Sequence, residues 1–340
     1  MKRELGTAPT LVSPFRLLRV DGKATSGNPD IAVMQEFRCA DRELGGGHLY
    51  SEVIAYLHSD LGPRLFAGDH GSSAAIFIAA AGLTEMAGWM AHDAGHDQRA
   101  YHHFCRARDL SELGRDRQLE VHVLASLSHL ALHRDKPTEA IRHAHDAEIA
   151  LSKAPGNPGL KARIYAMQAR SFAALHRPRD AHRLLDRAVA ALTDSGPIHA
   201  SPWVSHFDHG SLASEAARCW RELGDLARAG QHAQQIIDLR PPGRTRSRAF
   251  GQLTLAAIIT EQGHPERACT IATEAIGTTG SLGSYLVVRH LSDLQGRLQR
   301  YRGVPSVTEF LDYLGEEMRE RTWIQRWPPT NPTGRQLRPQ

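Results

Sequence analysis

Apolar residues recur at helical spacing over most of the chain, from about residue 28 onward. The segment before residue 66 shows the pattern first, with apolar positions at Leu49, Val53, Ile54, Tyr56, Leu57 and Leu61. Gly45 to Gly47 interrupt the helix before this segment, and Gly62 with Pro63 is expected to bend or end the helix within it. His48 follows the glycines directly, where a helix-capping or loop-packing role is expected. The pattern predicts an all-helical chain.

Beyond Ser72 the predicted helices come in pairs, and the turns inside the pairs recur at a regular interval. The predicted turn residues are Gly95, Asp135, His176, Gly224 and Gly263, with separations of 40, 41, 48 and 39 residues. Small residues stand seven positions before these turns, at Gly88, Ser128, Ala169, Ala217 and Ala256. Alanines stand five positions after them, at Ala100, Ala140, Ala181, Ala229 and Ala268. A third column, twelve positions after them, holds Ala107, Ala147, Ala188, Ile236 and Ala275.

Small residues at fixed positions mark places where two helices approach closely, because only a small side chain fits at a short interaxial distance. An alanine-rich composition would hardly keep three such columns in register. We therefore predict a solenoid of antiparallel helix pairs, about six to seven in number, in which each unit buries its face against its neighbours. A last pair, expected over residues 284–300 and 306–319, closes the array.

The repeat domain is predicted to span residues 36–322. Residues 1–35 mix Pro, Gly, Ser and Thr with one short apolar run, which indicates a poorly ordered or irregular arm. Residues 323–340 form a Pro-rich polar tail that is predicted to be disordered.

The register of small and large residues resembles the tetratricopeptide repeat, which implies a right-handed solenoid. A second resemblance is to the tetratricopeptide-like sensor region of actinobacterial transcriptional regulators of the XRE (lambda-repressor-like) type. It covers about residues 36–325 and is carried by GGGHLYSEVIAYLHSDLGPRLF, AGWMAHDAGHDQRAYHHF, LASLSHLALHRDKPTEAIRHA, and SPWVSHF leading into RCWRELGD. Those regulators carry an N-terminal helix-turn-helix domain, for which the first 35 residues here are too short. The resemblance implies a stand-alone, sensor-like protein.

The resemblance also implies that residues thirteen, ten, six, three and two positions before each turn line a concave groove. In the first two repeats these residues are Gly82, Glu85, Trp89, His92 and Asp93, then His122, Ala125, His129, Leu132 and His133. Helix geometry supports the second set independently, because His122, His129 and His133 lie within about 20° of one line on a helix of 3.6 residues per turn.

Histidines and a carboxylate on one face suit two kinds of chemistry. His92, His129 and His133 are the candidate ligands of a divalent transition metal such as Zn or Fe, because neutral imidazole binds these ions. Three protein ligands would leave coordination positions open to water or substrate. The same residues are the candidate catalytic groups of a metal-free acid–base site. A packed or solvated polar face is the alternative, since the chain has 20 histidines and chance clusters are expected.

Cationic residues follow further along the predicted groove. Arg163, Arg170, Arg218 and Arg221 occupy groove positions of the next repeats, and guanidinium groups suit a carboxylate or phosphate ligand. A solvated helix face with ion pairs is the alternative. Trp89 is placed either to stack on a flat or cationic ligand or to pack between repeats.

Composition and charge narrow the classes of function. A formal net charge of +4 with dispersed basic residues argues against nucleic acid as a partner. Four cysteines without CxxC spacing indicate a reduced protein rather than a disulfide or zinc-thiolate framework. No apolar run reaches the roughly 18 residues of a membrane span, and the N-terminus lacks the pattern of a signal peptide. We therefore expect a cytoplasmic protein without a membrane partner.

Two functions from different classes remain. The first is a stand-alone tetratricopeptide-like protein that binds a small molecule, a peptide or a partner protein in its groove. A homodimer is one of the assemblies expected for such a protein. The second is a metal-dependent or acid–base enzyme of specialised metabolism that uses the histidine cluster. Since a repeat groove can support either function, the sequence leaves both open.

Overall fold

The computed structural model describes residues 28–44, 49–66, 73–194, 200–241, 243–280 and 284–326. Over these ranges the chain forms helices packed in adjacent pairs as a helical repeat solenoid, so the predicted all-α class is confirmed. The arm up to residue 27, the interrupting Gly45 to Gly47, the position of His48 and the tail after residue 326 lie outside the described residues.

Six consecutive helix pairs form the array in the part of the chain that the structure describes. They are α4 (Ser73–Asp93) with α5 (Asp97–Gly114), α6 (Arg117–His133) with α7 (Pro137–Leu151), α8 (Pro158–Ala174) with α9 (Pro178–Thr193), α10 (His209–Glu222) with α11 (Leu226–Leu239), α12 (Thr245–Glu261) with α13 (Pro265–Thr279), and α14 (Tyr285–Leu298) with α15 (Pro305–Arg326). Three helices precede them: α1 (Pro29–Leu44), α2 (Tyr50–Tyr56) and α3 (Gly62–Phe66). A π-helical turn at Leu57–Leu61 leads directly into α3, and a 3-10 turn at Gln299–Tyr301 follows α14.

Helices extend beyond both ends of the predicted repeat domain, residues 36 and 322. α1 begins at Pro29 rather than after residue 35, because the Asn28 side chain accepts a hydrogen bond from the Asp30 backbone N–H at 2.9 Å and proline is well suited to the first helical position. α15 continues past residue 322 to Arg326. Arg321 donates to two carbonyl oxygens near the end of α13, which fastens this last helix to its neighbour.

Every predicted turn residue adopts the left-handed backbone conformation that ends a helix and reverses the chain. The φ angles are +81° at Gly95, +57° at Asp135, +52° at His176, +80° at Gly224 and +86° at Gly263. Glycine reaches this region without steric cost, whereas an L-residue such as histidine does not. The turn positions read from the sequence are therefore confirmed.

His176→Gly is expected to stabilise the protein by about 0.5–1 kcal/mol, because relief of left-handed strain exceeds the added entropy of the unfolded chain. The side chain of His176 is exposed, so little packing is lost. The opposite change, Gly224→Ala, is expected to destabilise by about 1–2 kcal/mol, since no atom lies within 4 Å of an added Cβ and only backbone strain acts. Urea unfolding would measure both; if neither variant shifts the free energy of unfolding, backbone strain at these turns is negligible.

The columns of small residues lie at the helix crossings. Ser128 is fully buried, and its hydroxyl donates to the carbonyl oxygen of Ala140 at 2.9 Å across the pair α6 and α7. A Cβ added to Gly88 would lie 2.4 Å from a ring carbon of Phe104 on the partner helix. The alanines of the second column are all fully buried. Close helix approach, as predicted, explains why these positions hold small residues.

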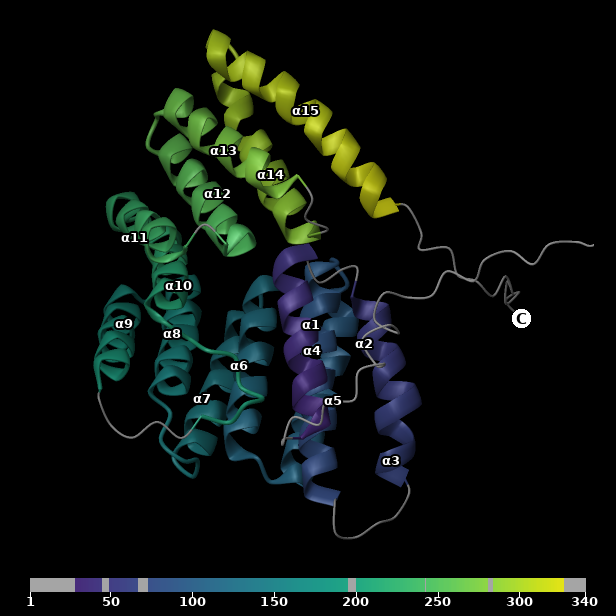
Figure 1. The fold of residues 1–340 in the computed structure, drawn as a ribbon. Coiled ribbons are helices and arrows are strands. Elements are labelled where there is room, and N and C mark those ends of the chain that lie inside the picture. Colours follow the sequence, from purple (N-terminus) through teal and green to yellow (C-terminus); the bar gives the residue numbers. More distant parts are fainter. Residues whose placement is uncertain are drawn as a thin grey trace, which may run out of the picture.

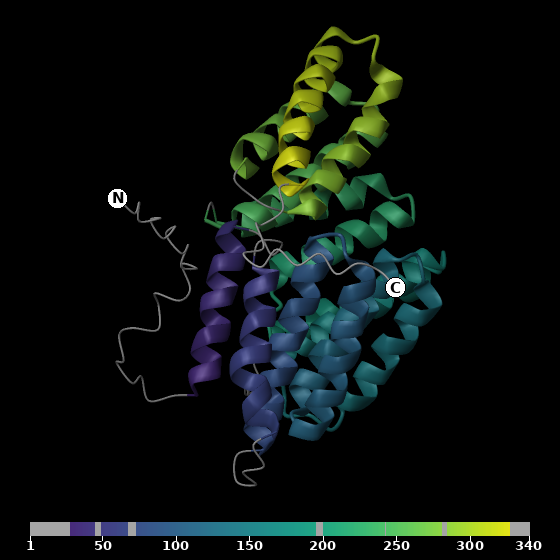
Figure 2. The ribbon, with the colours of Figure 1, turned by 90° about the vertical axis from the view of Figure 1, so that its right-hand side faces the viewer.

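The first helices of successive pairs contact one another and form an inner layer of α4, α6, α8, α10, α12 and α14. The array rises from the tier around α4 to α7 toward α12 to α15 at the top (Figure 1). The side view shows α1 as an upright helix along the lower tier (Figure 2). α1 contacts both α4 and α12, so it bridges two parts of the inner layer that are distant in sequence.

α4 contains an apolar segment that is longer than the sequence pattern suggested. The window Ala74–Asp93 has a mean hydropathy of 1.5 and meets the length and composition of a membrane span. The expectation that no segment reaches this length is therefore wrong. Because 67% of the window is buried inside the fold, α4 has the surroundings of a core helix.

Candidate functional site

The predicted groove residues converge on the inner layer, but they divide into two groups. The buried group consists of Glu85, His92, Asp93, His122 and Arg163. The partly exposed group consists of Trp89, His129, His133, Arg170, Arg218 and Arg221. Only the second group is accessible to a ligand from solvent.

Glu85, His122 and Arg163 form a hydrogen-bonded network that links α4, α6 and α8. Arg163 donates to Nδ1 of His122 at 2.6 Å, and because arginine has only donors, the proton of neutral His122 lies on Nε2. This nitrogen faces Oε1 of Glu85 at 3.3 Å. The same oxygen accepts from Trp89 Nε1 at 2.5 Å and from Ser126 Oγ at 2.8 Å. The polar groups of the network are thus bonded to one another.

Glu85 is ionised within this network. Burial raises the pKa of a carboxyl group. The charge that His122 carries when it is protonated at low pH, the charge of Arg163 and the hydrogen bonds from His122 and Ser126 outweigh burial and lower the pKa of Glu85 to about 2. Burial and the charge of Arg163 lower the pKa of His122. The network therefore carries a buried carboxylate and a buried guanidinium, bridged by a neutral imidazole.

The prediction that Glu85, His122 and Arg163 line an open groove is wrong, because another part of the chain covers this side of the inner layer. Arg38 of α1 donates to the carbonyl oxygens of Pro202 and Trp203 at 3.1 and 2.7 Å. Trp203 packs on Gly82, where an added Cβ would lie 2.5 Å from the indole ring. The segment before α10 and α1 therefore occupy the place that a ligand would take in an open groove.

Asp93 is also a structural residue rather than a groove residue. Its Oδ1 accepts from Ser284 Oγ at 2.7 Å, and its Oδ2 accepts from Arg246 at 3.2 Å. Arg246 also pairs with both carboxylate oxygens of Asp41 on α1. These contacts join the first helix pair to α1, α12 and the start of α14. The array thus curls until its sixth pair reaches its first.

His92, Asp97 and His133 lie together where α4, α5 and α6 meet. His92 Nδ1 donates to Asp97 Oδ1 at 2.7 Å, and His133 Nε2 lies 3.8 Å from Asp97 Oδ2. The two imidazole rings are 4.5 Å apart at an interplanar angle of 89°. The hydrogen bond from His92, which outweighs partial burial, lowers the pKa of Asp97. The carboxylate is therefore ionised between the two histidines.

His129 lies beside this group but faces other partners. Its ring is 5.9 Å from that of His92 and 5.0 Å from that of Trp89, and its Nδ1 lies 4.0 Å from Oε1 of Glu215 on α10. His129 lies one helical turn before His133 on the same face of α6, and the carboxylate beside it is Glu215 of α10, whereas the carboxylate beside His133 is Asp97 of α5. The structure therefore places Asp97, instead of His129, with the other two predicted metal ligands.

Arginines from three helices surround these histidines. Arg170 and Arg218 lie 3.1 and 4.0 Å from Oε2 of Glu215. Arg289, from α14, donates to Nε2 of His133. Among the described residues, no carboxylate oxygen lies within 4.0 Å of the Arg289 guanidinium. We call His129, His133, Arg170, Glu215, Arg218 and Arg289 the inner cluster.

Burial and these arginines lower the pKa of the nearby histidines. These histidines are His129, His133 and His290, which follows Arg289 on α14. Burial is the largest cause at all three, and the charge of Arg218 adds to it. The pKa of His133 falls to about 4 and that of His290 to about 3. The histidines are therefore neutral at pH 7, in surroundings of positive potential.

Arg221 and Trp89 have simpler roles. Arg221 pairs with Glu261 at 2.8 Å, as expected for a helix face with ion pairs. Trp89 donates to the buried Glu85 and makes edge contacts with the rings of Phe104 and His129. Both contacts of Trp89 correspond to packing between repeats rather than to stacking on a ligand.

Three residues of the site were missed in the sequence. Asp97 is the first residue of α5, which the groove positions did not include. Glu215 lies three residues before Arg218 on the same helix face, and this spacing was an available signal. Arg289 belongs to the sixth pair, whose turn was not assigned.

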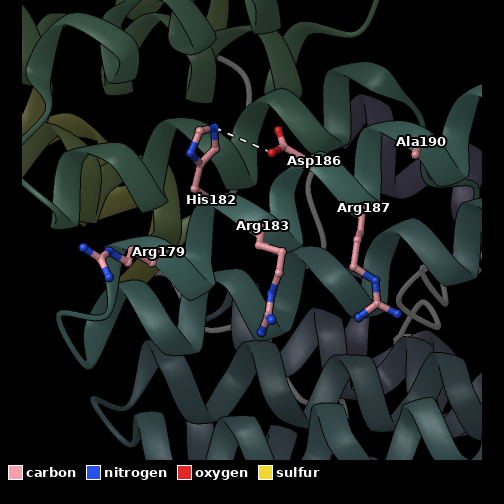
Figure 3. Close-up of a pocket in the computed structure, with 6 residues that line it drawn as sticks. All are labelled: Arg179, His182, Arg183, Asp186, Arg187 and Ala190. Atoms are coloured by element: carbon pink, nitrogen blue, oxygen red, sulfur yellow. Dashed lines mark ion pairs between the residues drawn. The ribbon is translucent and has the colours of Figure 1, made fainter.

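Two surface depressions lie elsewhere and involve mainly the second helices. One of about 530 Å³ is on α9 and is lined by Arg179, His182, Arg183, Asp186, Arg187 and Ala190. Figure 3 shows its arginines fanning out in different directions rather than converging. The other, of about 600 Å³, lies between α7, α8 and α9. Neither depression is lined by a residue of the inner cluster.

Comparison with known proteins assigns no family to the chain. No protein-family model matches it, and no curated protein matches it either. Functional inference therefore depends on the contacts within the structure.

Proposed function

We propose that the protein is a ligand-binding helical repeat protein, and that its inner cluster binds a small anionic ligand such as a carboxylate or phosphate compound. The observation that supports this proposal is the positive charge of the inner cluster. Three arginines from α8, α10 and α14 meet two neutral histidines and a single carboxylate, that of Glu215. The neighbouring carboxylate of Asp97 lies 3.8 Å from His133 and interacts with the charge of Arg289, but three guanidinium groups still outnumber these two carboxylates. An anion would balance the excess of positive charge.

The inner cluster is accessible as well as cationic. The exposed fraction of the side chain is 31% for Arg218, 21% for His133, 17% for His129 and 15% for Arg170. Partial burial strengthens charge-assisted hydrogen bonds, because solvent screens them less. Guanidinium groups match carboxylate and phosphate oxygens in two parallel bonds, and a neutral imidazole can donate one more.

The proposal agrees with the sensor-like role that the resemblance to regulator sensor regions implies. Such a protein would detect a ligand in the cytoplasm through its repeat domain. Binding at the inner cluster would touch α6, α8, α10 and α14 together, and it would therefore connect helices from both ends of the array.

The test is thermal unfolding and calorimetry at low ionic strength with inorganic phosphate and citrate as probes. We expect either probe to raise the unfolding temperature of the wild-type protein, because a ligand that binds only the folded state stabilises it. Arg218→Gln is expected to weaken binding about 10- to 100-fold, the usual value of a charge-assisted hydrogen bond. Circular dichroism would check that the variant is folded.

The matched control is Arg183→Gln on α9, where the arginine is 70% exposed and lies outside the inner cluster. This variant should respond to phosphate and citrate as the wild type does. An equal loss in both variants, or a wild-type protein that neither anion stabilises, would contradict the proposal.

A further inference from the structure

His92, Asp97 and His133 bring three potential metal ligands together from three consecutive helices. His92 lies in the last turn of α4, Asp97 is the first residue of α5, and His133 is the last residue of α6. One ligand atom from each residue lies within 4.8 Å of the others. The backbone turn at Gly95 fixes the short path between His92 and Asp97, and the stacking of the first two repeats adds His133.

We propose that these three residues form a binding site for one divalent transition metal ion such as Zn²⁺. Bonds of about 2.0–2.2 Å to nitrogen and oxygen place two ligand atoms of one ion about 3–4 Å apart. The separation of 3.8 Å between His133 Nε2 and Asp97 Oδ2 already falls in this range, and that of 2.7 Å between His92 Nδ1 and Asp97 Oδ1 is slightly shorter. Two imidazoles and one carboxylate leave further coordination positions open.

The ion would take the place of a hydrogen bond within the site. His92 donates from Nδ1 to Asp97 Oδ1, so an ion between these two residues would bind Nδ1 in place of that proton. The proton of the neutral imidazole would then lie on Nε2. Asp97 and His133 are 29% and 21% exposed, so an ion can reach the site from solvent.

Arg289 would compete with a metal ion for His133. It donates to His133 Nε2, the nitrogen that would bind the ion. Because Arg289 lies on an exposed part of α14, its side chain can move away when an ion binds. Removal of this arginine should therefore strengthen metal binding by freeing the lone pair of His133 and by removing a nearby positive charge. A purely structural role of the three residues does not predict this gain.

The experiment is titration of protein purified without a histidine tag, with Zn²⁺ followed by calorimetry and with Co²⁺ followed by its visible absorption. We expect about one ion per chain in the wild type. His133→Ala and Asp97→Asn, both at partly exposed positions, are expected to weaken binding at least tenfold, the usual effect of altering a ligand or a group that orients one. Arg289→Gln is expected to bind more tightly than the wild type.

The matched control is His182→Ala, because His182 and Asp186 form an exposed histidine–carboxylate pair on α9 at 3.7 Å (Figure 3). This variant should bind metal as the wild type does. Wild-type affinity in His133→Ala and Asp97→Asn, or a wild-type protein that binds neither ion, would overturn the proposal. The metal site and the inner cluster share His133, and Arg289 contacts both. Arg218→Gln distinguishes the two proposals, because it removes none of the three proposed metal ligands and should therefore bind metal as the wild type does.

Discussion

Replacing Glu85 by glutamine is expected to lower the free energy of unfolding by about 3–5 kcal/mol, the usual cost of breaking a buried charge network by removing one partner. The substitution would leave the Arg163 guanidinium buried without its carboxylate. The amide oxygen of glutamine could still accept from the donors around Oε1, namely Trp89, Ser126 and His122, but the amide would carry no negative charge and would place an NH2 group where the second carboxylate oxygen lies. Because the network spans three repeats, the loss should affect the first half of the array as a unit. Urea unfolding followed by circular dichroism measures it.

Glu139→Gln is the matched control for this prediction. Glu139 pairs with Lys136 at 3.3 Å and is 23% exposed, so its removal is expected to cost less than about 1 kcal/mol. A double variant, Glu85→Leu with Arg163→Met, should lose less than the sum of the two single changes, since neither charge is then left alone. Equal losses for Glu85→Gln and Glu139→Gln would show that the buried network adds nothing beyond a surface ion pair.

Gly88→Ala is expected to destabilise the protein by roughly 1–2 kcal/mol, although alanine is the better helix former. The added Cβ would lie 2.4 and 2.6 Å from two ring carbons of Phe104, which is fully buried and in edge contact with Trp89. Overpacking of this kind costs about 1–3 kcal/mol, whereas the gain in helix propensity is about 1 kcal/mol. The steric term should therefore exceed the propensity term.

Gly230→Ala provides a control of opposite sign. Gly230 lies inside α11, and the nearest atom to an added Cβ is Cγ2 of Ile258 at 3.7 Å, an ordinary contact. Only the propensity term remains, so this variant is expected to gain about 0.5–1 kcal/mol. Thermal or urea unfolding of the two variants gives the comparison. A stabilised Gly88→Ala would mean that the crossing of α4 and α5 has room for a methyl group.

The repeat spacing predicts which face of a helix a residue occupies, but it does not predict which other part of the chain contacts that face. The register placed His92 and His133 on the inner side, because both stand at fixed distances before their turns, and in the structure their rings lie 4.5 Å apart. It could not show that Trp203 covers Gly82, since that contact joins residues 82 and 203 through an irregular segment. Nor could it show that Arg163 is already bonded to His122, because a groove position and a buried position have the same helical phase.

The sequence by itself determined the helix pairs, the five turn residues and the crossing points of the helices. These features follow from local backbone preference and from contacts inside one pair, so each is specified by residues within one repeat. The tertiary structure alone decided which polar groups are satisfied internally and which remain accessible. It brings Arg289 to His133 across 156 residues and joins Asp93 to Ser284 across 191. Such contacts depend on the summed rotation of successive pairs, in which small differences at each interface add up, and no single repeat encodes that sum.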